Sequence, residues 1–177
     1  MNTWLTKDEI LNIPQEDLPL LVLSDNVRSF WSYAIKAHQH GSYNHLTWMA
    51  SPGFLISQDW ILHRVPVDKY LDGGHRLKFW TGKNWSAEGK AALCDHLNSQ
   101  PDWPILKRLY DPIQILGIFI GLRWLQIPGF PICSDHADLI HMVDPAWQHR
   151  QHLSPPEVNR LLKRDSDYVV YGRYAPD

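Results

Sequence analysis

Two short β-favouring segments joined by a tight-turn signal are the feature that most constrains this fold. Residues 45–50 and 54–58 are rich in apolar, β-branched and aromatic side chains, and Ser51-Pro52-Gly53 lies between them. Pro and Gly in so short a connection favour reversal of the chain, so the pair predicts an antiparallel hairpin. Further strands are expected over residues 18–23, 61–65, 75–81 and 168–174.

Helices are expected before, within and after this group of strands. Thr6, Ser86 and Ser154 are candidate N-caps, and Ser154 is followed by Glu157 three residues later, as in a capping box. Apolar residues at helical spacing predict helices over residues 27–39, 86–98, 111–124, 133–143 and 155–163. This order predicts an α+β fold in which an antiparallel sheet packs against helices.

Length, charge and cysteine content limit the class of protein. The chain of 177 residues predicts a single domain, 1–177, and two cysteines do not form a disulfide framework. A net charge of −2 gives no support for nucleic-acid binding. The most apolar run, residues 113–122, is too short to span a bilayer, and residues 1–7 lack the pattern of a signal peptide. A cytoplasmic location is expected, with a phage or prophage origin as an alternative.

Cys133 is the candidate nucleophile. It follows a loop that contains Pro128, Gly129 and Pro131, and it stands where a helical pattern begins. The free N–H groups and the dipole at a helix start stabilise a thiolate and lower its pKa. Cys94, by contrast, lies within an apolar helical segment and is expected to be a buried structural residue.

His45 is the candidate base among ten histidines. It begins a predicted strand directly after a loop, whereas most of the others lie in or beside predicted helices. A thiol nucleophile on a helix needs a histidine base, and a polar residue on the next strand can orient the imidazole. The next predicted strand offers Ser57, Gln58 and Asp59 for that role.

A metal site is the competing chemistry. His38 with His40, His149 with His152, and the group Asp135, His136, Asp138 and His141 contain ligand types, but none matches a specific zinc pattern. No glycine-rich phosphate loop is present either. The expectation is therefore that no cofactor is needed.

The order of these segments resembles one known family. Asn44-His45-Leu46, Ile56-Ser57-Gln58, residues 65–71, Leu109-Tyr110-Asp111, Ile132-Cys133-Ser134-Asp135 and residues 153–158 follow one another as in the circularly permuted NlpC-type papain-like hydrolases, the YiiX/YebB-like group. The chain is more distantly similar to lecithin retinol acyltransferase-like enzymes. The resemblance covers about residues 18–174 and rests on the order of short motifs, in which the His strand precedes the Cys helix.

The resemblance implies a function. It gives a permuted papain-like fold in which Cys133 matches the nucleophile and His45 the base. Its third position, often a carboxylate or histidine, is taken here by Gln58 or Ser57. Gln58 is preferred because its side chain reaches further, and Ser57 is the alternative. The implied reaction is cleavage of an amide bond through a thioester, with cell-wall peptides among the substrates. Acyl transfer or lipid-ester hydrolysis, and a non-catalytic binding module, are the alternatives; peptide, glycopeptide and acyl groups are the implied partners.

Overall fold

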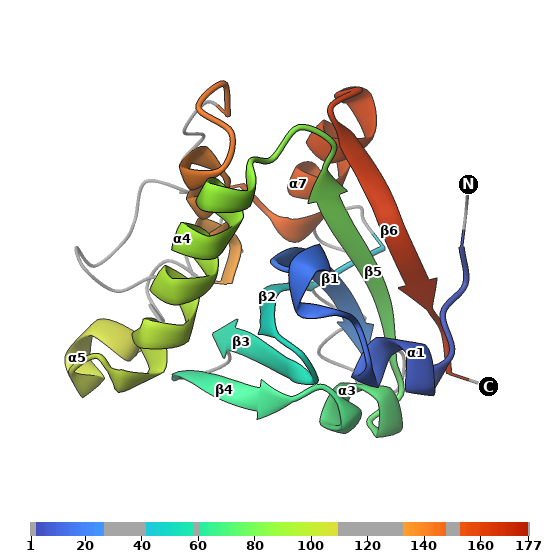
Figure 1. Cartoon of the computed structure of the whole chain (residues 1–177). Helices are drawn as coiled ribbons and strands as arrows, with labels where there is room; N and C mark the ends of the chain where they lie inside the picture. The colour runs from blue at the N-terminus through green and yellow to red at the C-terminus, as the bar shows by residue number, and fades with distance from the viewer. Residues whose placement is uncertain (1–2, 27–41, 59–60, 110–132, 148–152, 177) are drawn as a thin grey trace, which may run out of the picture.

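The computed structural model describes residues 3–26, 42–58, 61–109, 133–147 and 153–176. Six strands form one antiparallel sheet in the order β4-β3-β2-β1-β5-β6 (Figure 1). Their bounds are β1 Leu20–Asn26, β2 His45–Ser51, β3 Phe54–Gln58, β4 Leu62–Pro66, β5 His75–Gly82 and β6 Tyr168–Tyr174. The α+β class and the antiparallel sheet predicted from the sequence are confirmed.

Among the described residues the longest α-helices are α4, with 13 residues, and α7, with 10. The α-helices are α1 Lys7–Leu11, α3 Asp68–Asp72, α4 Ala87–Ser99, α5 Ile105–Arg108 and α7 Pro155–Arg164. In the part of the chain that the structure describes, the 3₁₀-helices are η1 Gln15–Asp17, η2 Gln100–Asp102 and η3 Cys133–Met142. The helical turn η2 therefore follows α4 directly, and α5 comes after it. The helices expected over residues 27–39 and 111–124 lie outside the described residues.

Local signals in the sequence set these boundaries. The hairpin between β2 and β3 turns at Gly53, whose φ of 74° is a left-handed value that suits glycine. Thr6 and Ser154 both form capping boxes, and the hydroxyl of Ser86 accepts the backbone N–H of Gly89. Each cap pairs an N–H that the first turn would otherwise leave without a partner.

The two faces of the sheet carry different helices. Trp48, Arg64 and Lys78 lie on one face, where they bond to η3, α4 and α7 respectively. Tyr70 of α3 bonds to Ser57 on the opposite face. An apolar core formed by residues from both faces includes Leu21, Leu23, Leu46, Trp48, Ile56, Leu93, Ile140 and Val158 on the first, and Val22, Met49, Leu55 and Phe79 on the second.

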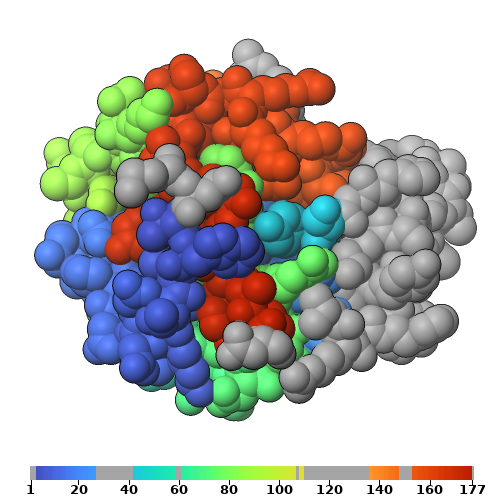
Figure 2. Space-filling model, turned by 90° about the vertical axis from the view of Figure 1, so that its right-hand side faces the viewer, coloured from blue at the N-terminus to red at the C-terminus, as the bar shows by residue number. Residues whose placement is uncertain are grey.

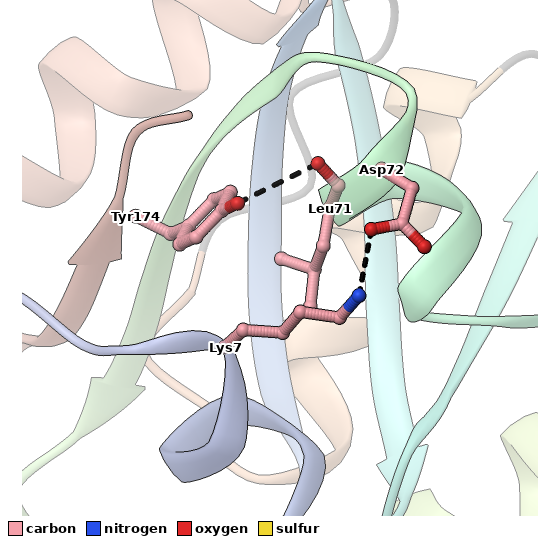
Figure 3. A network of polar contacts seen from close by, with 4 residues as sticks. All are labelled: Lys7, Leu71, Asp72 and Tyr174. Atoms are coloured by element: carbon pink, nitrogen blue, oxygen red, sulfur yellow. Dashed lines mark hydrogen bonds and ion pairs between the residues drawn. The ribbon is translucent and has the colours of Figure 1, made fainter. Parts of the chain in front are cut away.

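Helix α3 is joined to both ends of the chain. Figure 3 shows Lys7 of α1 reaching Asp72, with 2.6 Å between Nζ and Oδ1, and Tyr174 donating its hydroxyl to the carbonyl oxygen of Leu71 at 3.5 Å. The ion pair is exposed and contributes little to stability. These contacts place the end of β6 against α3. None of the helices described combines the length and apolar character needed to cross a bilayer.

Lys78 is an ionisable residue buried within the apolar core. Only 2% of its surface is exposed, its Nζ donates to Oδ1 of Asn159 at 3.2 Å, and it lies 4.0 Å from the centre of the Trp80 ring. Burial lowers the pKa of Lys78 to about 7, and the positive charges of Lys163 and Arg173 lower it further. The charged form is thus disfavoured in the folded protein.

We expect Lys78 to make stability depend on pH. Its pKa is about 7 in the folded chain and its ordinary value is 10.5. Between these values the unfolded chain binds a proton that the folded chain does not, so stability rises with pH across that window. Relative to Lys78→Met, the free energy of unfolding of the wild type should increase by on the order of 4 kcal/mol between pH 6 and pH 10.

Urea unfolding of both proteins at pH 6, 8 and 10 measures this difference. Lys69→Met, which removes an exposed lysine from α3 that does not act on Lys78, is the matched control and should stay parallel to the wild type. If the free energies of unfolding of the wild type and Lys78→Met differed by the same amount at all three pH values, the lowered pKa of Lys78 would be contradicted.

Candidate functional site

His45 begins β2 and is held by a chain of hydroxyl groups. Its Nε2 lies 2.9 Å from Oγ of Ser57, and that oxygen lies 2.8 Å from the hydroxyl of Tyr70. Ser57 is completely buried, and the ring of His45 stacks on that of Tyr70 with 6.5 Å between centroids. These contacts fix the rotation of the imidazole and assign Nε2 to Ser57.

The register of the β2–β3 pair explains why Ser57 is the partner. Thr47 pairs directly with Ser57, so His45, two residues before Thr47, lies on the same face as Ser57. Gln58 lies on the opposite face, where its Nε2 donates to the carbonyl oxygen of Arg108 at 2.8 Å. The preference for Gln58 as the residue that orients His45 is therefore corrected: Ser57 makes that contact.

Cys133 is the first residue of η3, as the sequence predicts for a thiol at a helix start. The position of its side chain lies outside what the structure describes, so the pairing of Cys133 with His45 stays a prediction. Helix η3 packs against β2, because Nε1 of Trp48 donates to the carbonyl oxygen of His136 at 2.9 Å.

This packing sets a condition on the predicted pair. Trp48, which contacts η3, and His45 lie on opposite faces of β2. His45 is also the first residue of the strand. Helix η3 and the side chain of His45 therefore lie on opposite faces of β2, and the predicted pair needs a route around the end of that strand.

His136 is a second imidazole near the predicted site. It lies in η3 with 5% of its surface exposed. Burial lowers its pKa to about 4, and the positive charges of His45 and His96 act in the same direction. Its Nδ1 is buried without a hydrogen-bond partner among the described residues. His136 is accordingly neutral at pH 7.

Two aromatic residues belong to this group although the sequence did not single them out. Tyr70 contacts both His45 and Ser57, and the ring of His75 lies 4.5 Å from that of Tyr70. The only sequence signal for Tyr70 is its place in residues 65–71, one of the segments that carry the family resemblance.

The remaining candidate residues from the sequence are Cys94 and the possible metal ligands. Cys94 is buried in α4, as predicted, and burial raises the pKa of its thiol to about 11, which makes it a poor nucleophile at neutral pH. Within the described residues no group of three or more His, Cys, Asp and Glu side chains is arranged to hold a metal ion. His38, His40, His149 and His152 lie outside those residues.

Comparison with known proteins identifies no relative. No family model matches this chain, and no curated protein or solved structure matches it significantly. The family resemblance described from the sequence therefore rests on its motifs alone.

We expect His136 to weaken the fold in acid. Because its folded pKa of about 4 lies below the ordinary value of 6.5, the unfolded chain binds the proton first as pH falls. Stability on the order of 2 kcal/mol should be lost between pH 6.5 and pH 4.

His136→Gln should make that loss shallower in urea unfolding measured at pH 7, 5.5 and 4.5. The matched control is His141→Gln, which changes an exposed histidine of the same helix. Identical acid profiles for the wild type and His136→Gln would show that another group is responsible.

Proposed function

We propose that this chain is a cysteine hydrolase of the permuted papain-like type, which cleaves amide bonds through a thioester. The observation that carries the proposal is the hydrogen-bonded chain from His45 to Ser57 and Tyr70. It holds a histidine at the start of the strand against which the Cys133 helix packs. The order of motifs in the sequence supports the same assignment.

The proposed reaction gives each of these residues a role. Since Nε2 of His45 is bonded to Ser57, Nδ1 is the nitrogen that takes the proton of the Cys133 thiol. The thiolate attacks the substrate carbonyl carbon, and the backbone N–H at the start of η3 stabilises the oxyanion. His45 then donates the proton to the departing amine, which leaves a thioester on Cys133.

The second half of the reaction uses the same base. His45 removes a proton from water, the resulting hydroxide attacks the thioester, and the carboxylic acid and the free thiol are released. Transfer to another acceptor would give the acyltransferase that is the alternative enzyme. Ser57 keeps the imidazole in position through both halves, with Tyr70 fixing the Ser57 hydroxyl.

A non-catalytic binding module is the alternative from another class. The observation that favours it is the neutral character of Ser57, since a hydroxyl stabilises an imidazolium less than a carboxylate does. The reactivity of Cys133 separates these readings, because a binding module needs no activated thiol.

We expect Cys133 to be alkylated as an activated thiol. In the native protein, the rate of iodoacetamide labelling should reach half its maximum at a pH well below 8.5. An ordinary cysteine, whose pKa is about 8.5, would reach half its maximal rate near that pH. Mass spectrometry of peptides locates the label. His45→Ala should move the midpoint upward, whereas His63→Ala, a histidine of β4, should not. Cys94 serves as the unreactive internal standard. A labelling midpoint near pH 8.5 that does not change in His45→Ala would overturn the enzymatic proposal.

We also expect Ser57→Ala to slow alkylation of Cys133 at pH 7 by about fivefold, which corresponds to one hydrogen bond of about 1 kcal/mol. Gln58→Ala tests the residue preferred from the sequence and should have the smaller effect on this rate. Circular dichroism checks that both variants are folded. A larger effect from Gln58→Ala would return the orienting role to that residue.

A further inference from the structure

A small pocket opens at the end of the sheet where β2 and β5 begin. It has a volume of about 220 Å³ and is lined by Trp4, Ser42, Tyr43, Arg76, Leu77, Arg173 and Tyr174. Figure 2 shows atoms of the N-terminal segment, the start of β2, β5 and β6 meeting on one face of the molecule. Four separate parts of the chain thus contribute to this surface.

Two arginines in the pocket differ in their pairing. Nε of Arg76 donates to the buried carboxylate of Asp25 at 3.1 Å, so the charge of Arg76 is compensated. Arg173 has no such partner: among the described residues its guanidinium contacts no carboxylate, and its Nε is buried without any hydrogen bond. A buried donor left unpaired costs free energy, which an acceptor bound in the pocket would recover.

The surroundings of Arg173 favour an anion. Lys78 lies directly opposite Arg173 in the β5–β6 register, so its ammonium group adds positive charge beside Arg173 whenever it is protonated. The hydroxyl-bearing side chains of Ser42 and Tyr43 supply neutral polar groups at the same pocket. A guanidinium presents its donors in a planar fork that matches the two oxygens of a carboxylate.

The pocket lies at the same end of the sheet as His45. Tyr43 precedes His45 by two residues, and Ser24 and Asn26 of β1 pair with His45 and His75. Tyr174 also donates to Leu71, which follows the Tyr70 that stacks on His45. A substrate bound near His45 could therefore place another of its groups in this pocket.

We propose that the pocket around Arg173 binds a carboxylate group of the substrate, so that the hydrolase acts on acidic peptides or other carboxylate-bearing amides. The claim that this carboxylate belongs to the substrate rests on the proposed function. The binding of a carboxylate at Arg173 stands apart from it and is tested separately.

Binding is measured by calorimetry on the Cys133→Ala protein, which removes the thiol. N-acetylglutamate should bind, and its uncharged counterpart N-acetylglutamine should bind at least tenfold more weakly. Arg173→Gln should abolish the difference in affinity between the two ligands, and Arg173→Lys should weaken the binding of N-acetylglutamate several-fold. The control Arg160→Gln, which changes an exposed arginine of α7, should leave the binding of N-acetylglutamate unaltered. Equal affinity for the two ligands, or no effect of either Arg173 variant, would overturn the pocket, and tighter binding of inorganic phosphate would overturn the assignment to a carboxylate.

The link to the substrate is measured on the wild-type chain. N-acetylglutamate should slow the iodoacetamide labelling of Cys133, and this protection should disappear in Arg173→Gln. Binding without protection of a reactive Cys133 would overturn the assignment to the substrate. If Cys133 proves unreactive, the proposed function fails, and with it the assignment to a substrate, while calorimetry still decides whether the pocket binds a carboxylate.

Discussion

The pairing register of β2 with β3 is the constraint on which the rest of this structure depends. Successive side chains of a strand point to opposite faces, so a shift of one residue exchanges the two faces completely. The observed pairing puts Trp48 beside η3 and Ser57 beside Tyr70. A shifted strand would send the Trp48 ring away from η3 and deprive its N–H of the His136 carbonyl oxygen.

A β-bulge in this hairpin selects the partner of His45. Ser51 pairs with Phe54 at the turn, and an unbroken ladder continued from there would place Thr47 opposite Gln58. The register shifts between Met49 and Ser51, and Thr47 then pairs with Ser57. The extra residue of the bulge thereby turns Ser57 rather than Gln58 toward the histidine.

The sequence predicts much of the described fold because its signals are local. The Gly53 turn and the caps at Thr6, Ser86 and Ser154 depend on a few neighbouring residues, and the structure has each of them. The choice between Ser57 and Gln58 could not be made in that way. That choice depends on a bulge, and the residues around Met49 carry no sequence signal for where the register of the β2–β3 pair will shift.

Cationic groups inside the fold were missed for a related reason. Alternation marks Lys78 and Arg173 as members of strands, but not that they pair directly with each other. Only the order of strands shows this, since β6 comes from the end of the chain and β5 from its middle. The same holds for Tyr70, which reaches Ser57 because α3 folds back over the sheet.

The electrostatics of the two proposed sites fit together. Ser57 and Tyr70 offer His45 hydrogen bonds without charge, so they hold the imidazole but add little to the stability of an imidazolium. Arg173 adds positive potential, which lowers the pKa of Lys78 and by itself disfavours a further cation close by. A substrate carboxylate bound at Arg173 would offset that potential. Under the two proposals, the ligand would supply the negative charge that the hydroxyl chain lacks, so that a thiolate–imidazolium pair would form more readily when an acidic substrate is bound.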